Sequence, residues 1–441
     1  MRRILILLIC AGGRLLQAAD SDPLTLETAV KIALERHPDV GKARAAADVL
    51  EGKIREVRAQ ALPEVNINAG FNRMRDPAFL NSSSLDKFPK ELIDALDPVG
   101  SNIFSYNVTL RQPLYTAGKV GAALRLASVE AEGASAEIDR AKQDLAVEVV
   151  RAFYALMWAE RFRENVAETQ AQREKHAAMA RTRRQHGVAT EVDVLRSELA
   201  VANGKPDIVR ADNAVRQARA LLNYYLARPA DFPTRIQGGF IDEPWTEWDL
   251  DALARDAFRA RPELTRLKIA ERSADVMFNL AKAESRMRAD LTTEYGVMSR
   301  LPKNLVNSRF VRWNVGVNLT LPVFDGFRRS GLVWQATANQ RGARLEREKL
   351  EQQIRLGLQQ ALDDIKAAQE TIEAARANVR QAERVLEMTQ ANYHYGAATT
   401  LDVVDAQTAL SVARTNLLRG LHDSSVARAN LRWAMGRTPW E

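Results

Sequence analysis

The sequence has little cysteine and few aromatic residues. Cys10 is the only cysteine among 441 residues, and aromatic residues make up 6% of the chain. A chain with one cysteine cannot build an internal disulfide framework. Alanine, arginine, glutamate, leucine and glutamine are abundant instead, and this composition favours long helices with small contact residues over a thick globular core.

Long hydrophobic runs are also missing. No segment reaches the roughly 18 consecutive apolar residues that predict a transmembrane helix. The N-terminus, MRRILILLICAGGRLLQAAD, has two arginines, a short apolar run and two small residues, Ala18 and Ala19. Together these predict a secretory signal peptide over residues 1–19. Ile9 precedes Cys10 where a lipoprotein signal has a small residue, which argues against lipidation of the cysteine.

The sequence lacks blocks of like charge and catalytic motifs as well. The net charge is +7, but basic and acidic residues are interspersed, which indicates a solvated helical surface and no nucleic-acid partner. The five histidines lack metal-ligand spacing, and there is no P-loop, nucleophile elbow or HExxH motif. We therefore expect no enzymatic activity, no cofactor and no metal site.

What the sequence does contain is a duplication. HGVATEVDVL at 186–195 matches YGAATTLDVV at 395–404, and the offset of 209 residues between the two glycines extends over the surrounding 125 or so positions without a gap. An earlier stretch, LTLETAVKIALERHP, matches WDLDALARDAFRARP. Two long copies predict a pseudo-symmetric body rather than a solenoid. We expect a first repeat at 20–228, a linker at 229–247 and a second repeat at 248–441.

Each repeat contains two segments in which apolar and polar residues alternate. These segments are residues 65–71, 104–111, 291–298 and 313–321. A period of two predicts strands with one apolar and one polar face, and their length is close to the roughly nine residues of a tilted transmembrane strand. Four strands cannot close a barrel, and lipid does not tolerate open sheet edges. A membrane sheet would therefore need several chains in one barrel, and an open channel three or more.

Each repeat then continues into a long segment without proline, at 119–185 and 328–394. Such a segment predicts a helix of about 100 Å. In the second copy a large residue recurs every seven positions, and a small residue follows each of them three positions later. The large residues are Leu358, Ile365, Ile372, Val379 and Leu386, and the small ones are Ala361, Ala368, Ala375, Ala382 and Thr389. This heptad predicts a left-handed coiled coil in which helices approach closely.

The repeated ten-residue motif ends each long helix. Gly187 and Gly396 can adopt the positive φ that terminates a helix. Thr190 and Thr399 then stand at the N-cap of a return helix, over residues 191–226 and 400–435. Asp193 and Asp402 follow three residues later as a shortened capping box. His186 and His394 flank the turns, and because histidine titrates near neutral pH they are candidate pH sensors.

With these features in place, the chain resembles the TolC-like outer-membrane efflux family. The resemblance rests on the opening LTLETAVKIALERHP, the strand-to-helix transitions QPLYTAGK and LPVFDGFR, both turns, and ARALLNYYLARP with ARANLRWAMGRT at the helix ends. It implies a mostly α fold with a small β part. Antiparallel coiled-coil hairpins would form an α-barrel, and four strands per chain would contribute to a trimeric 12-stranded β-barrel in the outer membrane.

The resemblance also implies a function and its partners. Family members are exit ducts of tripartite efflux pumps or type I secretion systems, located in the outer membrane and extending into the periplasm. The expected partners are two further copies of the chain, a periplasmic adaptor, an inner-membrane pump of RND, ABC or similar type, and outer-membrane lipid. The transported substrate does not follow from the resemblance, because the inner-membrane pump selects it.

Site residues can be carried over where this sequence matches the family pattern. The turns are where the family meets its adaptor; the matching residues are Gly187, Val188, Ala189, Gly396, Ala397 and Ala398. The family narrows its tunnel near the turns; the matching residues are Asp193, Tyr393, Asp402 and Asp405. In the family a tyrosine at the place of Tyr393 is linked to an acid at the place of Asp193. The best-known member has an arginine at the place of Ala398, so this chain must hold its closed state differently or more weakly.

Two alternatives remain open at this stage. Asp193 and Asp402 also fit as plain capping acids, whereas Asp405 has no capping role and is the better gate residue. A periplasmic coiled-coil adaptor or scaffold would share the long helices. Such a protein usually has one hairpin and a β-rich lipoyl-like domain, so two equal copies with paired amphipathic strands argue against it.

Overall fold

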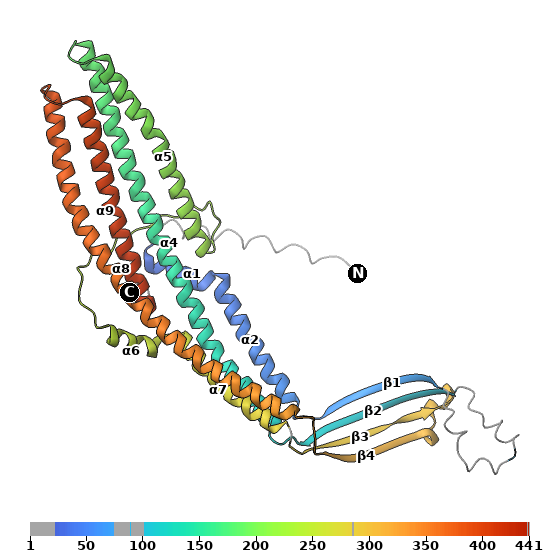
Figure 1. The fold of residues 1–441 in the computed structure, drawn as a ribbon. Coiled ribbons are helices and arrows are strands. Elements are labelled where there is room, and N and C mark those ends of the chain that lie inside the picture. Colours follow the sequence, from blue (N-terminus) through green and yellow to red (C-terminus); the bar gives the residue numbers. More distant parts are fainter. Residues whose placement is uncertain (1–22, 75–88, 90–100, 285, 439, 441) are drawn as a thin grey trace, which may run out of the picture. The chain divides into compact units, whose positions relative to one another are not determined.

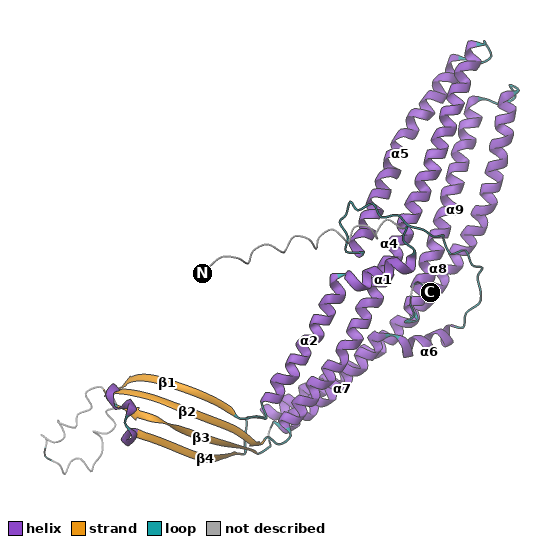
Figure 2. Cartoon of the chain, turned by 180° about the vertical axis from the view of Figure 1, so that it is seen from behind, coloured by secondary structure: helices purple, strands orange, loops and turns teal. Residues whose placement is uncertain are grey.

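The computed structural model describes residues 23–74, 89, 101–284, 286–438 and 440. The expected signal peptide at 1–19, with Cys10, lies outside the described residues. The same order of elements occurs twice along the chain: two helices, two strands, a long helix and a return helix (Figures 1 and 2).

Equivalent helices of the two copies have equal lengths of 11, 22, 67 and 35 residues. The first copy consists of α1 (Leu26–Arg36), α2 (Pro38–Ala59), β1 (Glu64–Met74), β2 (Ser101–Tyr115), α4 (Lys119–Gln185) and α5 (Glu191–Tyr225). The second consists of α6 (Leu250–Ala260), α7 (Pro262–Ala283), β3 (Arg288–Ser299), η3 (Pro302–Val306), η4 (Ser308–Phe310), β4 (Val311–Thr320), α8 (Arg328–His394) and α9 (Thr400–Ala434). The internal duplication is therefore visible in the fold.

The chain forms two compact units, and each unit combines segments of both copies. Within the described residues, the first unit contains 23–46, 134–266 and 346–440, and the second contains 47–133 and 267–345. The long helices α4 and α8 each contribute to both units. The compact units are thus a different division of the chain from the repeats in its sequence.

The four strands form one antiparallel sheet in the order β1-β2-β3-β4. Its register pairs Ile67 with Val108, Val108 with Tyr295, and Tyr295 with Trp313. These four side chains share one face and are 79%, 40%, 58% and 72% exposed. Directly paired residues lie on the same side of a pleated sheet. The apolar residues of the alternating segments therefore form one exposed face of the sheet.

The opposite face of the sheet is polar. Glu294 on β3 accepts hydrogen bonds from Asn107 on β2 and from Arg312 on β4, each at 2.5 Å. The strands are longer than the alternating segments of the sequence. β2 has 15 residues, and it continues past the last alternating position through an irregularity between Pro113 and Tyr115. Proline cannot donate a hydrogen bond to the neighbouring strand, so the regular pairing is interrupted at Pro113, but the strand continues beyond it.

The first unit contains two buried helical clusters, one built mostly from each repeat. In the first repeat Phe153 and Leu156 of α4 pack with Leu222 of α5, and in the second Leu358 of α8 packs with Leu431 of α9. All ten predicted heptad positions of α8 are buried or half-buried, as a coiled-coil seam requires. Truncating a fully buried leucine of this kind to alanine generally costs about 2–5 kcal/mol.

The two hairpins, α4 with α5 and α8 with α9, lie side by side with both turns at the same end (Figures 1 and 2). The described helices include none that is long and apolar enough to cross a membrane.

Candidate functional site at the hairpin turns

The first turn ends α4 with a glycine in the left-handed conformation. Gly187 has φ 75°, its N–H donates to the carbonyl of Arg184, and the N–H of Val188 donates to the carbonyl of Arg183, both at 2.9 Å. This is the Schellman arrangement, which satisfies the last carbonyls of a helix. No atom lies within 4 Å of a Cβ placed at Gly187, so the glycine is required for its backbone conformation and not for space.

The second turn repeats this geometry. Gly396 has φ 80°, its N–H donates to the carbonyl of Tyr393 at 3.1 Å, and the N–H of Ala397 donates to that of Asn392 at 2.8 Å. Here too the position of a Cβ on the glycine is open. The two turns therefore present the same backbone to solvent, as their matching sequences indicated.

Both return helices begin with a complete capping box. Thr190 caps α5, where its hydroxyl accepts from the Asp193 N–H at 3.2 Å and its own N–H donates to the Asp193 carboxylate at 3.1 Å. Thr399 and Asp402 do the same for α9, at 3.3 and 2.7 Å. Hydrogen bonds from the capping threonine lower the pKa of both carboxyl groups, so both acids are ionised at neutral pH.

The residues expected to meet an adaptor are small, and the structure leaves most of them accessible. Gly187, Gly396 and Ala397 are exposed, and Val188 is 62% exposed. The other two, Ala189 and Ala398, are half-buried. At these positions a partner would thus meet mainly backbone and small side chains, and the large apolar side chains beside them are Val188 and the neighbouring Tyr395, which is 85% exposed.

Tyr393 is not linked to Asp193 directly. Its ring is 5% exposed, and its hydroxyl oxygen accepts from the hydroxyl of Thr400 at 3.4 Å. Thr400 is fully buried, and its side chain also acts on Asp193, where it helps to lower the pKa of that acid. The connection expected between Tyr393 and Asp193 therefore runs through Thr400, which the sequence did not single out.

Two residues of α4 that the sequence reasoning missed also contact Tyr393. The ring of His176 lies 4.8 Å from the tyrosine ring, measured between centroids, and His176 is only 3% exposed. The guanidinium of Arg183 lies 4.9 Å from the same ring centroid. At the 209-residue offset the second copy has Val385 and Asn392 in these places. This difference between the two copies was visible in the sequence, but the sequence did not indicate that His176 and Arg183 contact Tyr393.

Asp405 lies one turn after Asp402 on α9, and both are exposed. One carboxylate oxygen of Asp402 is engaged in the cap. Among the described residues none hydrogen-bonds or ion-pairs with Asp405. The two histidines that flank the turns, His186 and His394, are exposed, and the buried histidine near the turns is His176.

Comparison with known proteins decides the family. The sequence model of the family described as "Outer membrane efflux protein" matches residues 29–228 and 253–437.

The chain belongs to the outer membrane efflux protein family.

Relatives match the chain over nearly its whole length. It is 23% identical to the outer membrane protein TolC of Vibrio cholerae, over 92% of this chain and 89% of that protein. It is 24% identical to the outer membrane protein OprJ of Pseudomonas aeruginosa, over 93% and 84%.

Solved structures share the fold. A membrane protein from Pseudomonas aeruginosa superposes with a TM-score of 0.78 at 22% identity, over 94% of this chain and 91% of that one. The open state of the MtrE outer membrane channel of Neisseria gonorrhoeae superposes with a TM-score of 0.73 at 20% identity, over 94% and 89%.

The protein is accordingly an outer-membrane efflux channel that extends into the periplasm, of the kind that forms part of tripartite efflux pumps. The fold class expected from the sequence, helical hairpins with four strands per chain that contribute to a trimeric barrel, is confirmed. The family is one of transport proteins. The alternative, a periplasmic adaptor or scaffold, gains no support from these comparisons.

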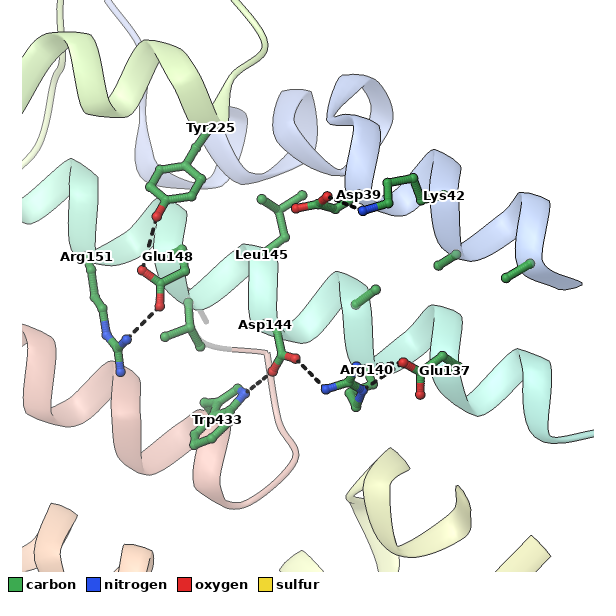
Figure 3. A pocket seen from close by; sticks show the side chains of 14 residues that line it. Asp39, Lys42, Glu137, Arg140, Asp144, Leu145, Glu148, Arg151, Tyr225 and Trp433 are labelled. Carbon is green, nitrogen blue, oxygen red and sulfur yellow. Dashed lines mark hydrogen bonds and ion pairs between the residues drawn. The ribbon is translucent and has the colours of Figure 1, made fainter. Parts of the chain in front are cut away.

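The channel also carries a groove of about 640 Å³ between α2, α4 and the ends of α5 and α9 (Figure 3). Asp144 lies between Arg140, at 3.4 Å, and the indole N–H of Trp433, at 3.3 Å. Burial raises the pKa of Asp144, and the neighbouring Arg140 opposes this. Glu148 likewise pairs with Arg151 and accepts from Tyr225. Both ion pairs lie within α4, and the hydrogen bonds from Trp433 and Tyr225 link α4 to α9 and α5 within the first unit.

We expect the packing between the turns to weaken on acidification, because His176 is buried. Burial lowers its pKa below 6.5, and the charge of Asp193 only partly offsets this. Above pH 6.5 the imidazole is neutral in both folded and unfolded states. As the pH falls below 6.5 the unfolded state gains the proton first, so stability decreases until the folded-state pKa is passed.

The protection of amides against hydrogen exchange at the end of α8, corrected for the intrinsic exchange rate at each pH, would show this change when measured above and below pH 6.5. His176→Gln removes the titrating group and should abolish the additional loss of protection at low pH. Equal pH dependence in the variant would assign the effect to other groups.

Proposed function

We propose that the channel is the homotrimeric exit duct of a tripartite efflux pump or a type I secretion system. One observation carries the proposal: the sheet has an exposed apolar face, and within the described residues its outer strands, β1 and β4, have no further partner. Lipid does not tolerate open strand edges, so further copies must close the sheet. Three chains with four strands each would form a barrel wide enough to leave a lumen.

The turns supply the second part of the proposal, the contact with a periplasmic adaptor. Each chain has two turns of equal geometry with small, accessible residues. With repeats at 20–228 and 248–441 joined by the linker at 229–247, a trimer would present six such turns. An adaptor that binds there connects the duct to an inner-membrane pump of RND, ABC or similar type, and that pump selects the substrate.

The acids on α9 supply the third part, a constriction that opens and closes. In a trimer Asp402 and Asp405 would each occur three times, and rings of carboxylates favour cations and repel one another. Asp402 is occupied in its capping box, whereas the Asp405 carboxylate is exposed and unpaired among the described residues. Asp405 is therefore the stronger candidate for the constriction.

The duct can be tested by fractionation and complementation. We expect the full chain in outer-membrane extracts as an oligomer of three copies that dissociates on heating in detergent. We also expect it to restore export in a strain that lacks its own outer-membrane channel, provided that the cognate adaptor and pump are present. A monomer in the soluble periplasmic fraction would contradict the proposal and favour the adaptor alternative.

A further inference from the structure

Ala398 has no polar side chain, which raises the question of which residues hold the second turn in place. A contact that crosses between the two hairpins provides an answer. One nitrogen of the Arg183 guanidinium, Nη1, donates to the carbonyls of Tyr393 at 2.9 Å and His394 at 3.0 Å. Arg183 lies near the end of α4, whereas the two carbonyls belong to the last turn of α8. The hydrogen bonds thus join residues 210 and 211 positions apart.

The chemistry of this contact favours a firm attachment. The last carbonyls of a helix lack intrahelical partners and carry partial negative charge, so a cation placed there gains both hydrogen bonds and electrostatic energy. Arginine is always charged, and its guanidinium also lies 4.9 Å from the centre of the Tyr393 ring. Arg183 is half-buried, which reduces screening by solvent.

The tyrosine that receives this contact is itself enclosed. His176, also on α4, packs on one part of the Tyr393 ring, and Thr400 of α9 donates to its hydroxyl. Tyr393 therefore has neighbours from α4 and α9, and Arg183 holds the backbone at the same residue. His176, Arg183, Tyr393 and Thr400 together are named the inter-turn contact below.

The arginine and histidine of the inter-turn contact occur in the first copy only. At the offset of 209 residues the position of Arg183 is taken by Asn392, which is exposed, and that of His176 by Val385, which is 46% exposed. The second hairpin therefore has no equivalent of Arg183 or His176 at these positions. Separation of the two turns must break the hydrogen bonds of Arg183.

We propose that Arg183 is the positioning residue that holds the second turn against the first and so keeps the periplasmic constriction closed. Arg183 does so by holding two carbonyls of α8 from within the same chain. This inference rests on the proposed function, because it requires the second turn to carry the constriction residues Asp402 and Asp405.

The test is single-channel current through the full-length purified channel in planar bilayers, without an adaptor. Arg183→Met keeps the apolar stem and removes the donors. We expect about a tenfold higher ratio of open to closed channels, the shift that loss of one charge-assisted hydrogen bond produces. Arg183→Lys retains the charge without the planar fork and should give an intermediate ratio. The matched control is Arg184→Met, which removes the same charge one residue further on, where Arg184 pairs with Glu191 at 3.3 Å.

Hydrogen exchange at the last turn of α8 provides the second measurement. Arg183→Met should accelerate exchange at residues 390–396, and Arg184→Met should not. Faster exchange with an unchanged current would show that the contact does not hold the constriction, and unchanged exchange would show that the contact is not made; either result overturns the inference. If the wild type and all variants carry no current, the proposed duct fails as well. Equal currents in wild type and Arg183→Met refute the inference alone.

Discussion

Ala397→Trp should abolish export while the trimer, the barrel and the single-channel current persist. Ala397 lies in the second turn, is exposed, and contributes only its backbone N–H to the turn, through the bond to Asn392. Because position 397 is exposed, a tryptophan there should extend into solvent and block the close approach of a partner hairpin. Overpacking a fitted contact costs about 1–3 kcal/mol or more, and in a trimer the block occurs three times, so docking should be lost altogether.

The matched control separates docking from the conformation of the turn. Gly396→Asn leaves a small residue that tolerates the left-handed φ of 80° at this position, so export should remain close to wild type. Val188→Trp places the same bulk on the first turn and shows whether both turns dock. Export at the wild-type rate in Ala397→Trp would exclude the second turn from docking, and loss of the trimer would mean that the turn serves folding.

Asp405→Asn should relieve the block of channel current by multivalent cations. Three carboxylates that converge on one axis form a strong cation site, and asparagine removes their charge while it keeps their shape. Because Asp405 is exposed and free of partners among the described residues, its neutralisation should not disturb the turn. We expect the blocking concentration to rise by about tenfold or more, since each lost charge weakens the same site.

Two further variants test whether this effect is specific to Asp405. Asp402→Asn removes charge but also weakens a capping box, so it should lower the stability of the turn and relieve the block less. In the first copy the place of Asp405 is taken by Arg196. Arg196→Gln should therefore leave the block unchanged or strengthen it. An unaltered block in Asp405→Asn would place this acid outside the narrow part of the lumen.

Much of the architecture could be read from local patterns. The sheet faces follow from alternation because neighbouring side chains of a strand point to opposite sides, as the row from Ile67 to Trp313 shows. The seam of α8 follows from its period of seven. The turns follow from a glycine, a threonine and an aspartate whose hydrogen bonds span three residues. In each case the signal is a short spacing along the chain, so it can be read before the partner of each residue is known.

The surroundings of Tyr393 could not be read in this way. The resemblance suggested a partner, Asp193, but not the intervening Thr400, because the reach of a side chain across helices depends on their packing. The end of β2 shows the same limit, since its ladder continues past Pro113 with the support of a neighbouring strand. Pairing with β3 extends β2 beyond the residues whose alternation predicted a strand.

The sequence by itself determined the duplication, the strand faces, the helix seams and the two capped turns, because each depends on a short, repeating spacing. Only the tertiary structure decided which side chain joins the turns. Three arginines lie at the end of α4: Arg181 and Arg184 pair with Glu198 and Glu191 of α5, and Arg183 reaches the carbonyls of α8. Successive side chains of a helix point about 100° apart. The orientation of α4 about its own axis therefore decides that Arg183 faces α8 while Arg181 and Arg184 face α5.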